Sequence, residues 1–248
     1  MSETHDEIAS ALPHDLDALP RRRGFRLRGL EMTRLEGFVD ATFAFAVTML
    51  IIAGQQVPDD VSALLAAFRH VPAFAASIIV LAIFWRGHWV WSRRYGLEDT
   101  VSIWISWALI FTMLIYVYPL KVIFGGMFAA LSEGRLGQPI AVRSTGEARA
   151  IFAVYALGFS ALALEIVLLN LRAWSFRHAL RLNEREALLT RGSIEGWAIP
   201  FLLGLVSLVL ALILPRGSIG WSGWIYYSMA VLLPLHTRWL HRRAAQLP

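Results

Sequence analysis

Two acidic residues lie in stretches that are otherwise apolar, where a charged group could bind or pass on an ion. Asp40 lies near the start of residues 34–53, which carry no further charge after it. Glu165 lies within a second such stretch, residues 150–171. A carboxylate at membrane depth costs about 3 kcal/mol or more, so each acid indicates either a functional site or a buried ion pair. Both interpretations stay open for Asp40. For Glu165, the functional interpretation is an ion or proton relay, and the structural one is an ion pair with an arginine near the inner membrane interface.

The spacing of the sequence limits which residue could pair with Asp40. Arg34 lies six positions before Asp40, so the two do not share a helix face. We therefore expect the partner on a neighbouring helix, at the depth of Trp85 and His88. A pair of this kind would be structural, and it could also hold the first helix in place for function.

The stretch that contains Asp40 also has a regular seam. Its members follow steps of four and three, and they are Arg34, Phe38, Ala41, Phe45, Thr48 and Ile52. Such spacing places them on one line of a helix, and at about 100° per residue Asp40 points about 120° away from it. The seam could be ordinary helix packing or the wall of an ion path. A threonine in such a seam commonly bonds a carbonyl of its own backbone.

The remaining residue types argue against an enzyme. The chain has no cysteine, which excludes disulfides, thiolate metal sites and cysteine nucleophiles. His236 and His241 are five positions apart and cannot share a helix face as metal ligands. The sequence shows neither a nucleophile–base pair nor a glycine-rich phosphate loop. We therefore expect no catalytic residue, no metal and no cofactor.

Six apolar segments would position these residues. They are residues 35–53, 72–91, 101–124, 150–171, 197–214 and 221–240. A helix of about 20 residues crosses a ~30 Å hydrocarbon core, whereas a lone strand cannot satisfy its backbone in lipid. The predicted fold class is therefore an all-α membrane protein with six transmembrane helices.

Composition agrees with a membrane protein. The chain is 57% hydrophobic and only 17% charged, which lies above the apolar share of soluble domains. The net charge of +5 does not indicate a nucleic-acid partner, because the basic residues lie between apolar spans. Residues 1–30 are polar and basic and predict a disordered cytosolic tail. Residues 31–243 would then form the membrane domain.

The basic residues also predict the orientation in the bilayer. If the N-terminus is cytosolic, 17 of the 23 basic residues fall in segments on that side. Cytosolic connections carry an excess of Lys and Arg, so both termini are expected in the cytosol of a multi-pass cell-membrane protein. The strong preference for arginine over lysine suggests a bacterial source.

The start of the first apolar segment resembles the signature of the bacterial transmembrane-protein-175-like potassium channels. The residues that match are Arg34, Phe38 and Asp40, followed by Ala41, Phe43, Ala44, Ala46 and Thr48. The second segment shares Phe84, Trp85 and His88 with that family, and the third ends at Pro119. The resemblance is specific in the first helix and extends over about residues 30–240 by hydropathy.

This resemblance implies a homotetramer of six-helix subunits in the lipid bilayer, with the first helix around the pore. Members have no pore-loop filter, and this sequence likewise lacks a Thr-Val-Gly-Tyr-Gly loop. By register, the implied pore and gate positions for K⁺, and for other monovalent cations, are Ala41, Phe45, Thr48 and Ile52. The implied structural network at the cytosolic end consists of Arg34, Phe38, Asp40, Trp85 and His88.

The chain departs from the family pattern at three positions. Val39 replaces a serine, Ser106 replaces an asparagine, and Phe45 replaces the usual Ile or Leu of the first constriction. A ring of phenylalanines would be bulkier and would favour dewetting. We therefore expect a potassium-selective or weakly selective cation channel. The alternatives are a proton-coupled secondary transporter that uses Asp40 and Glu165, and a non-conducting membrane scaffold if Phe45 seals the pore.

Overall fold

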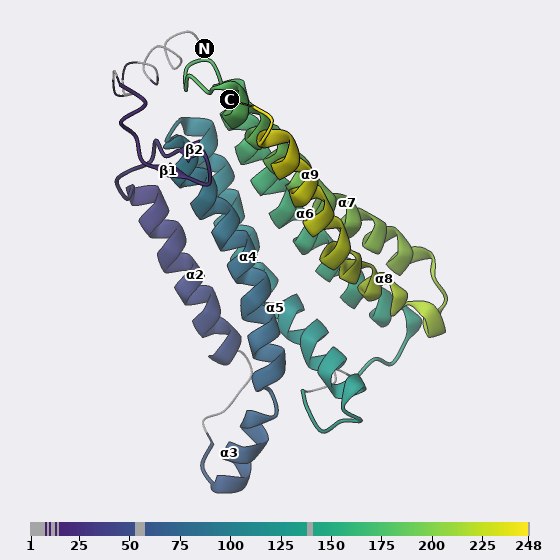
Figure 1. The fold of residues 1–248 in the computed structure, drawn as a ribbon. Helices are drawn as coiled ribbons and strands as arrows, with labels where there is room; N and C mark the ends of the chain where they lie inside the picture. Colours follow the sequence, from purple (N-terminus) through teal and green to yellow (C-terminus); the bar gives the residue numbers. More distant parts are fainter. Residues whose placement is uncertain are drawn as a thin grey trace.

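The structure is a computed structural model that describes residues 15–52, 58–137 and 141–247, together with residues 8, 10 and 13. Nearly all of it is helical (Figure 1). The long helices are α2 (Arg34–Ile52), α4 (Val71–Tyr95), α5 (Thr100–Leu131), α6 (Thr145–Ser175) and α7 (Glu184–Ile213). The short elements are β1 (Arg21–Arg22), β2 (Phe25–Arg26), α3 (Val61–Phe68), η1 (Arg216–Ser218), α8 (Trp221–Trp224), η2 (Ile225–Ser228) and α9 (Met229–Ala244).

The predicted all-α membrane fold is confirmed. Among the described residues, five helices are long and apolar enough to cross a membrane, namely α2, α4, α5, α6 and α7. The sixth predicted span, residues 221–240, is helical too, but it is divided into α8, η2 and α9, which follow one another directly and have 4, 4 and 16 residues. The predicted end of the first span, Ala53, lies outside the described residues.

Helix α7 begins well before the predicted start at residue 197. Asn183 caps it with a complete capping box, in which the Asn183 side chain accepts from the Glu186 backbone N–H and the Glu186 side chain accepts from that of Asn183. Helix α6 runs only to Ser175. The chain between the predicted spans 150–171 and 197–214 is therefore mostly helix, and the turn within it is short.

Helix α5 continues to Leu131 although residues 101–124 were the predicted span. Pro119 lies inside it and does not end it, because helices in membranes tolerate proline where packing satisfies the freed backbone. Helix α3 was not predicted. Asp60 caps it by accepting a hydrogen bond from the Ala63 backbone N–H, and none of its residues is buried.

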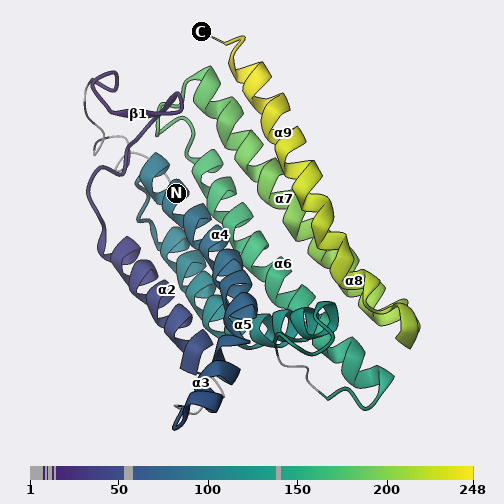
Figure 2. The same ribbon diagram turned by 60° about the horizontal axis from the view of Figure 1, so that its bottom comes forward.

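The helices form one bundle with its core between α4, α5 and α6. Its fully buried side chains include Leu81, Phe84, Leu109, Met113, Leu120, Leu162 and Ile166. Helix α2 packs on α4 and α5, and α9 packs on α7. Figure 2 shows α2 at one edge of the bundle and α9 at the other. The β1–β2 hairpin and the C-terminal end of α9 lie at one end of the molecule, and α3 lies at the opposite end (Figure 1).

The segment just before α2 is packed on the bundle, whereas we expected residues 1–30 to be a disordered tail. Phe25 is 1% exposed, and its ring meets that of Tyr95 edge-on at 5.5 Å between centroids. The backbone N–H of Gly29 donates to the Arg93 carbonyl at 3.2 Å. Residues 1–7 of the predicted tail lie outside the described residues. The hairpin thus anchors the chain before the first span begins.

A buried ion-pair cluster explains why this basic segment is ordered. Arg26 and Arg28 each place Nη2 at 2.9 Å from Oε2 of Glu186. The Glu186 side chain is fully buried, and those of Arg26 and Arg28 are 10% and 1% exposed. Hydrogen bonding to Glu186 raises the pKa of Arg26. Composition alone does not predict this order, because Glu186, the acid that neutralises the arginines, lies 160 positions from Arg26 in the sequence.

Candidate functional site

Helix α2 has two distinct faces in the structure. The residues that it buries in the bundle are Glu36, Val39, Thr42, Ala46 and Leu50. They follow steps of three and four, so they form one stripe of the helix. This stripe, and not the predicted seam, packs α2 onto α4 and α5.

The predicted seam is the exposed face of α2. Its six members are all exposed in the single chain: Arg34, Phe38, Ala41, Phe45, Thr48 and Ile52. Phe45 is 56% exposed and Ile52 is 62% exposed. The seam is therefore not the stripe that packs α2 onto its own subunit. An unbroken line of this kind must face lipid, another subunit or an ion path.

Thr48 is the polar member of this face in the C-terminal half of α2. Its hydroxyl donates to the carbonyl of Ala44 at 3.0 Å, as expected for a threonine in a helix. A hydroxyl oxygen that donates its proton keeps two lone pairs as acceptors. The bond to the backbone therefore leaves Thr48 able to present oxygen to a cation on the exposed side.

Asp40 is bonded to the bundle rather than turned to the seam. Trp85 Nε1 on α4 donates to Asp40 Oδ1 at 2.7 Å. The Trp85 ring also stacks on Phe43 of α2, with centroids 5.5 Å apart and planes at 25°. The expectation that Asp40 finds its partner on the next helix near Trp85 agrees with this geometry. Trp85 thus contacts α2 with both its polar and its apolar surface.

His88 is placed near this contact but bonds elsewhere. Its Nε2 lies 3.0 Å from Ser106 Oγ on α5, and both residues are buried. The resemblance implied an asparagine in place of Ser106, and the shorter serine side chain still provides a polar partner. His88 therefore links α4 to α5, while Trp85 links α4 to α2.

Phe38 and Arg34 occupy the N-terminal part of the seam. The Phe38 ring lies 5.1 Å from that of Trp107 on α5, at 38°, so it covers α5 although it is 45% exposed. Arg34 is exposed and forms no ion pair within the described parts of the chain. The structure does not bring Arg34 to Asp40. The network predicted for these two residues stays a prediction for the assembled protein.

The ion pair that does fix α2 within the subunit was missed. Arg93 Nε lies 3.1 Å from Glu36 Oε1, and the Glu36 side chain is 2% exposed. Arg93 also donates to the carbonyls of Gly29 and Leu30 at 3.2 and 3.0 Å. One arginine of α4 therefore holds both the first turn of α2 and the chain that leads into it. The only sequence signal was an acid in the first helical turn, which is favourable in any helix.

Glu165 has a partner other than the arginine we considered. Thr112 of α5 donates its hydroxyl to Glu165 Oε1 at 2.7 Å, and Glu165 is 8% exposed. The nearby arginine, Arg172, instead pairs with Asp99 at 2.8 Å. Asp99 is the N-cap of α5 and accepts from the Val101 backbone N–H, so it already lies where an arginine at the end of α6 can reach it. The inner-interface arginine pair for Glu165 is therefore wrong.

Across residues 15–52, 58–137 and 141–247, no group of three or more His, Cys, Asp or Glu side chains is arranged to hold a metal ion. The exposed face of α2 instead presents apolar side chains and the hydroxyl of Thr48. Such a surface could act on a partly hydrated ion without binding it tightly.

Fold and site together define a multi-pass helical membrane protein with an unusual first helix. Comparison with known proteins then gives its family. Residues 34–119 match the family model described as the endosomal/lysosomal potassium channel TMEM175. A potassium channel of Marivirga tractuosa is 31% identical over 235 residues, which cover 90% of this chain and 93% of the relative.

The solved structures agree with this relationship. The crystal structure of a variant of the potassium channel MtTMEM175, in complex with a nanobody–MBP fusion protein, matches with a TM-score of 0.77 and 28% identity. The match covers 90% of this chain and all of the other. This chain belongs to the TMEM175 potassium channel family. The family resemblance inferred from the first helix is confirmed, and it is a family of channels rather than enzymes.

Proposed function

We propose that this chain is the subunit of a homotetrameric potassium channel, with the exposed face of α2 around the pore. The observation that carries the proposal is that the whole seam from Arg34 to Ile52 is exposed while the opposite stripe of α2 is buried. Relatives that cover nearly the whole chain are potassium channels. A permeation role for α2 explains why a long apolar face is left without a partner in the subunit.

Assembly is needed because one helix cannot enclose an ion path. Closed rotational symmetry places the same face of every subunit around one axis. An α2 face on this axis would turn Phe45, Thr48 and Ile52 into successive rings. Fourfold symmetry follows the family resemblance, and the mass of the detergent-solubilised protein tests it.

The chemistry of these rings indicates how ions would be controlled. Phe45 and Ile52 are apolar, so they set the width of the path and its tendency to dewet. Thr48 lies between them and offers hydroxyl oxygens to an ion that has lost part of its water. No acid lies on this face between Ala41 and Ile52. Selectivity would then arise from the cost of dehydration rather than from fixed charge.

Membrane placement is part of the same proposal. The hairpin, rich in arginine, and the basic last turn of α9 lie at one end of the bundle (Figure 1). The positive-inside rule favours the cytosol for that end, in the cell membrane of a bacterium. Residues 31–243 would form the channel domain, preceded by the anchored hairpin.

A potassium flux assay in proteoliposomes tests the proposal. We expect K⁺ uptake down its own gradient, with no requirement for a proton gradient. Uptake that depends on protons would instead favour the secondary transporter that uses Asp40 and Glu165. Reconstituted, correctly sized tetramers without any flux would favour the non-conducting scaffold.

A further inference from the structure

A pocket lies on the subunit away from the exposed face of α2. Its volume is about 330 Å³, and α4, α6 and α7 form its walls. The residues that line it are Ile83, Arg86, Gly87, Val90, Trp91, Arg94, Asn170, Ser193 and Trp197. None of these residues belongs to the proposed pore, so the pocket needs an explanation of its own.

The polar part of the pocket is cationic. Arg86 and Arg94 line it, and no acidic residue does so in the described chain. The Arg94 side chain donates to Ser193 Oγ at 2.8 Å, and its guanidinium lies 4.9 Å from the centre of the Phe25 ring. Arg94 is therefore held in place. Arg86 is exposed and has no ion pair within the described residues, so its charge is available to a ligand.

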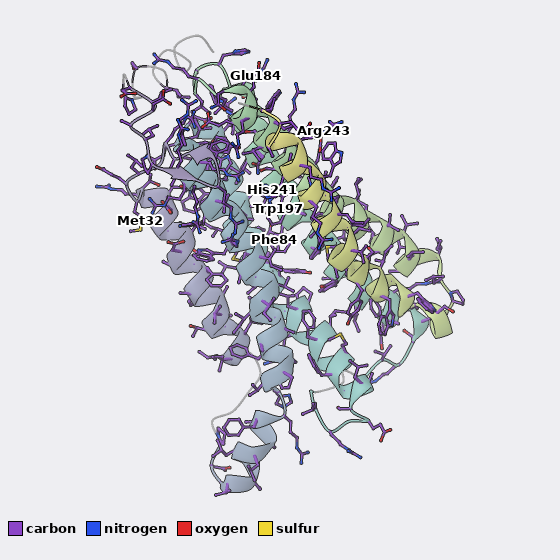
Figure 3. All side chains as sticks on the ribbon, viewed as in Figure 1. Met32, Phe84, Glu184, Trp197, His241 and Arg243 are labelled. Carbon is purple, nitrogen blue, oxygen red and sulfur yellow. The ribbon has the colours of Figure 1, made fainter. Side chains whose placement is uncertain are left out.

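The remaining walls are apolar and aromatic. Ile83, Val90 and Trp91 come from α4, and Trp197 comes from α7. The ring of Trp197 lies against α4 because position 87 is glycine: a Cβ there would lie 2.5 Å from Trp197 Cζ2. Figure 3 labels Trp197 and its neighbour Phe84, whose ring centroids are 5.7 Å apart. The pocket thus joins a cationic rim to an apolar wall.

The location of the pocket in the bundle fits its cationic rim and its apolar wall. Arg94 lies in the last turn of α4, at the end of the bundle where the β1–β2 hairpin packs. Ser193 lies in the N-terminal third of α7, at the same end. Basic pockets between helices at the cytoplasmic membrane surface suit the head groups of anionic lipids.

We propose that this pocket binds an anionic phospholipid. Its phosphate would lie between Arg86 and Arg94, with Ser193 and Asn170 as further hydrogen-bonding groups. An acyl chain would follow the apolar wall at Ile83. A free phosphate ion shares the headgroup chemistry but has no use for that wall. The proposal does not depend on conduction, because it concerns a surface of the subunit remote from α2.

Native mass spectrometry of the full-length, delipidated protein tests the proposal. The protein is incubated with dioleoyl-phosphatidylglycerol or with dioleoyl-phosphatidylcholine, and bound lipid per subunit is counted. We expect phosphatidylglycerol to bind at least fivefold more tightly than phosphatidylcholine. Arg86→Gln should weaken the binding of phosphatidylglycerol about fivefold, since one arginine near the surface changes the affinity for anionic lipid by about this factor. The matched control is Arg238→Gln, an exposed arginine of α9 outside the pocket, which should leave binding unchanged.

A second variant fills the apolar wall without changing any charge. Val90→Trp should reduce phosphatidylglycerol binding in protein that elutes at the normal size. Millimolar inorganic phosphate should leave the lipid bound. Equal binding of the two lipids, equal losses in the two arginine variants, or unchanged binding in folded Val90→Trp would each overturn the proposal. Displacement by phosphate alone would assign the site to a free anion instead, which also overturns it.

Discussion

Trp85 Nε1 lies 2.7 Å from Asp40 Oδ1, so the second long helix supplies the hydrogen-bond donor for the acid of the first. The same indole stacks on Phe43. Asp40 is therefore satisfied from within the subunit, on the side of α2 away from the exposed seam. In the proposed channel it would set the rotation of α2 rather than meet the ion.

Removal of this donor should destabilise the protein. Trp85→Phe keeps the aromatic stacking but leaves Asp40 without the indole N–H. We expect a loss of about 1.5–3 kcal/mol, the usual range for a hydrogen bond to a charged group, measured by thermal unfolding in detergent. Asp40→Asn keeps an acceptor oxygen and should lose less stability than Trp85→Phe. A larger loss for Asp40→Asn, or an altered ion preference in its intact tetramers, would place Asp40 on the permeation path.

Phe45→Ala should increase potassium flux in proteoliposomes. The Phe45 side chain is 56% exposed on the seam, and loss of four rings would widen and wet the proposed constriction. We expect a severalfold rise in flux or a weaker preference for K⁺ over Na⁺.

Phe43→Ala is the matched control for Phe45→Ala, because Phe43 belongs to the same helix but stacks on Trp85 inside the bundle. Phe43→Ala should lower stability without a comparable rise in flux per amount of reconstituted protein. If the two variants conduct alike, or if flux is unchanged in Phe45→Ala, Phe45 is not in the pore.

The ion pair between Glu36 and Arg93 should be costly to break from one side only. Arg93→Met leaves a carboxylate that is 2% exposed without its cation, and we expect a loss of about 3–5 kcal/mol. The double variant Glu36→Leu and Arg93→Met should recover part of the lost stability, because it leaves no unpaired buried charge. Thermal unfolding of the two singles and the double gives the coupling energy, and strictly additive losses would show that the pair is not coupled.

The buried cluster at Glu186 should protect the hairpin from trypsin. Arg26 and Arg28 are cleavage sites, but their side chains are 10% and 1% exposed. Glu186→Gln should speed cleavage at these two positions at least tenfold, because two arginines lose their buried counter-charge. Glu184→Gln is the control, since Glu184 is an exposed acid in the same first turn of α7 and pairs with neither arginine of the cluster. Equal cleavage rates in wild type and Glu186→Gln would mean that the cluster does not anchor the hairpin.

Glu165→Gln should leave potassium flux within about twofold. Glu165 lies on α6 and bonds Thr112 on α5, away from the seam of α2, and the glutamine carbonyl can accept the same hydrogen bond. The measurement is flux with and without an imposed proton gradient. A proton-coupled flux that is abolished in Glu165→Gln would revive the transporter interpretation.

The sequence predicted best what depends on periodicity. Five of the six apolar runs correspond to helices long and apolar enough to cross a membrane. The four–three spacing on the first helix singled out the face that the structure leaves exposed. The depth of Trp85 also indicated the partner of Asp40. These features follow from the regular rise and turn of a helix, which one sequence carries by itself.

The features that were missed depend on contacts between distant positions. Glu36 and Arg93 are 57 positions apart, and Arg26 is 160 positions from Glu186. No spacing rule connects residues so far apart in the sequence, so the sequence alone does not show that their charges pair. The early start of α7 did have a local signal, because Asn183 and Glu186 form the pattern of a capping box. Hydropathy placed the start of the span at residue 197 instead, because the first turns of α7 are too polar to count as membrane span.

The Glu36–Arg93 pair is an ionic anchor at the N-terminal end of α2. Ile52 lies about 24 Å farther along the helix axis, and the buried residues nearest to that end, Ala46 and Leu50, are apolar. If α2 tilts as a rigid rod about its anchored turn, a rotation of about 5° displaces the Ile52 end by ~2 Å and moves Phe45 by a little over half as much. The Glu36–Arg93 pair would then be the pivot of α2, and a small change in the tilt of the helix would displace the Ile52 end most.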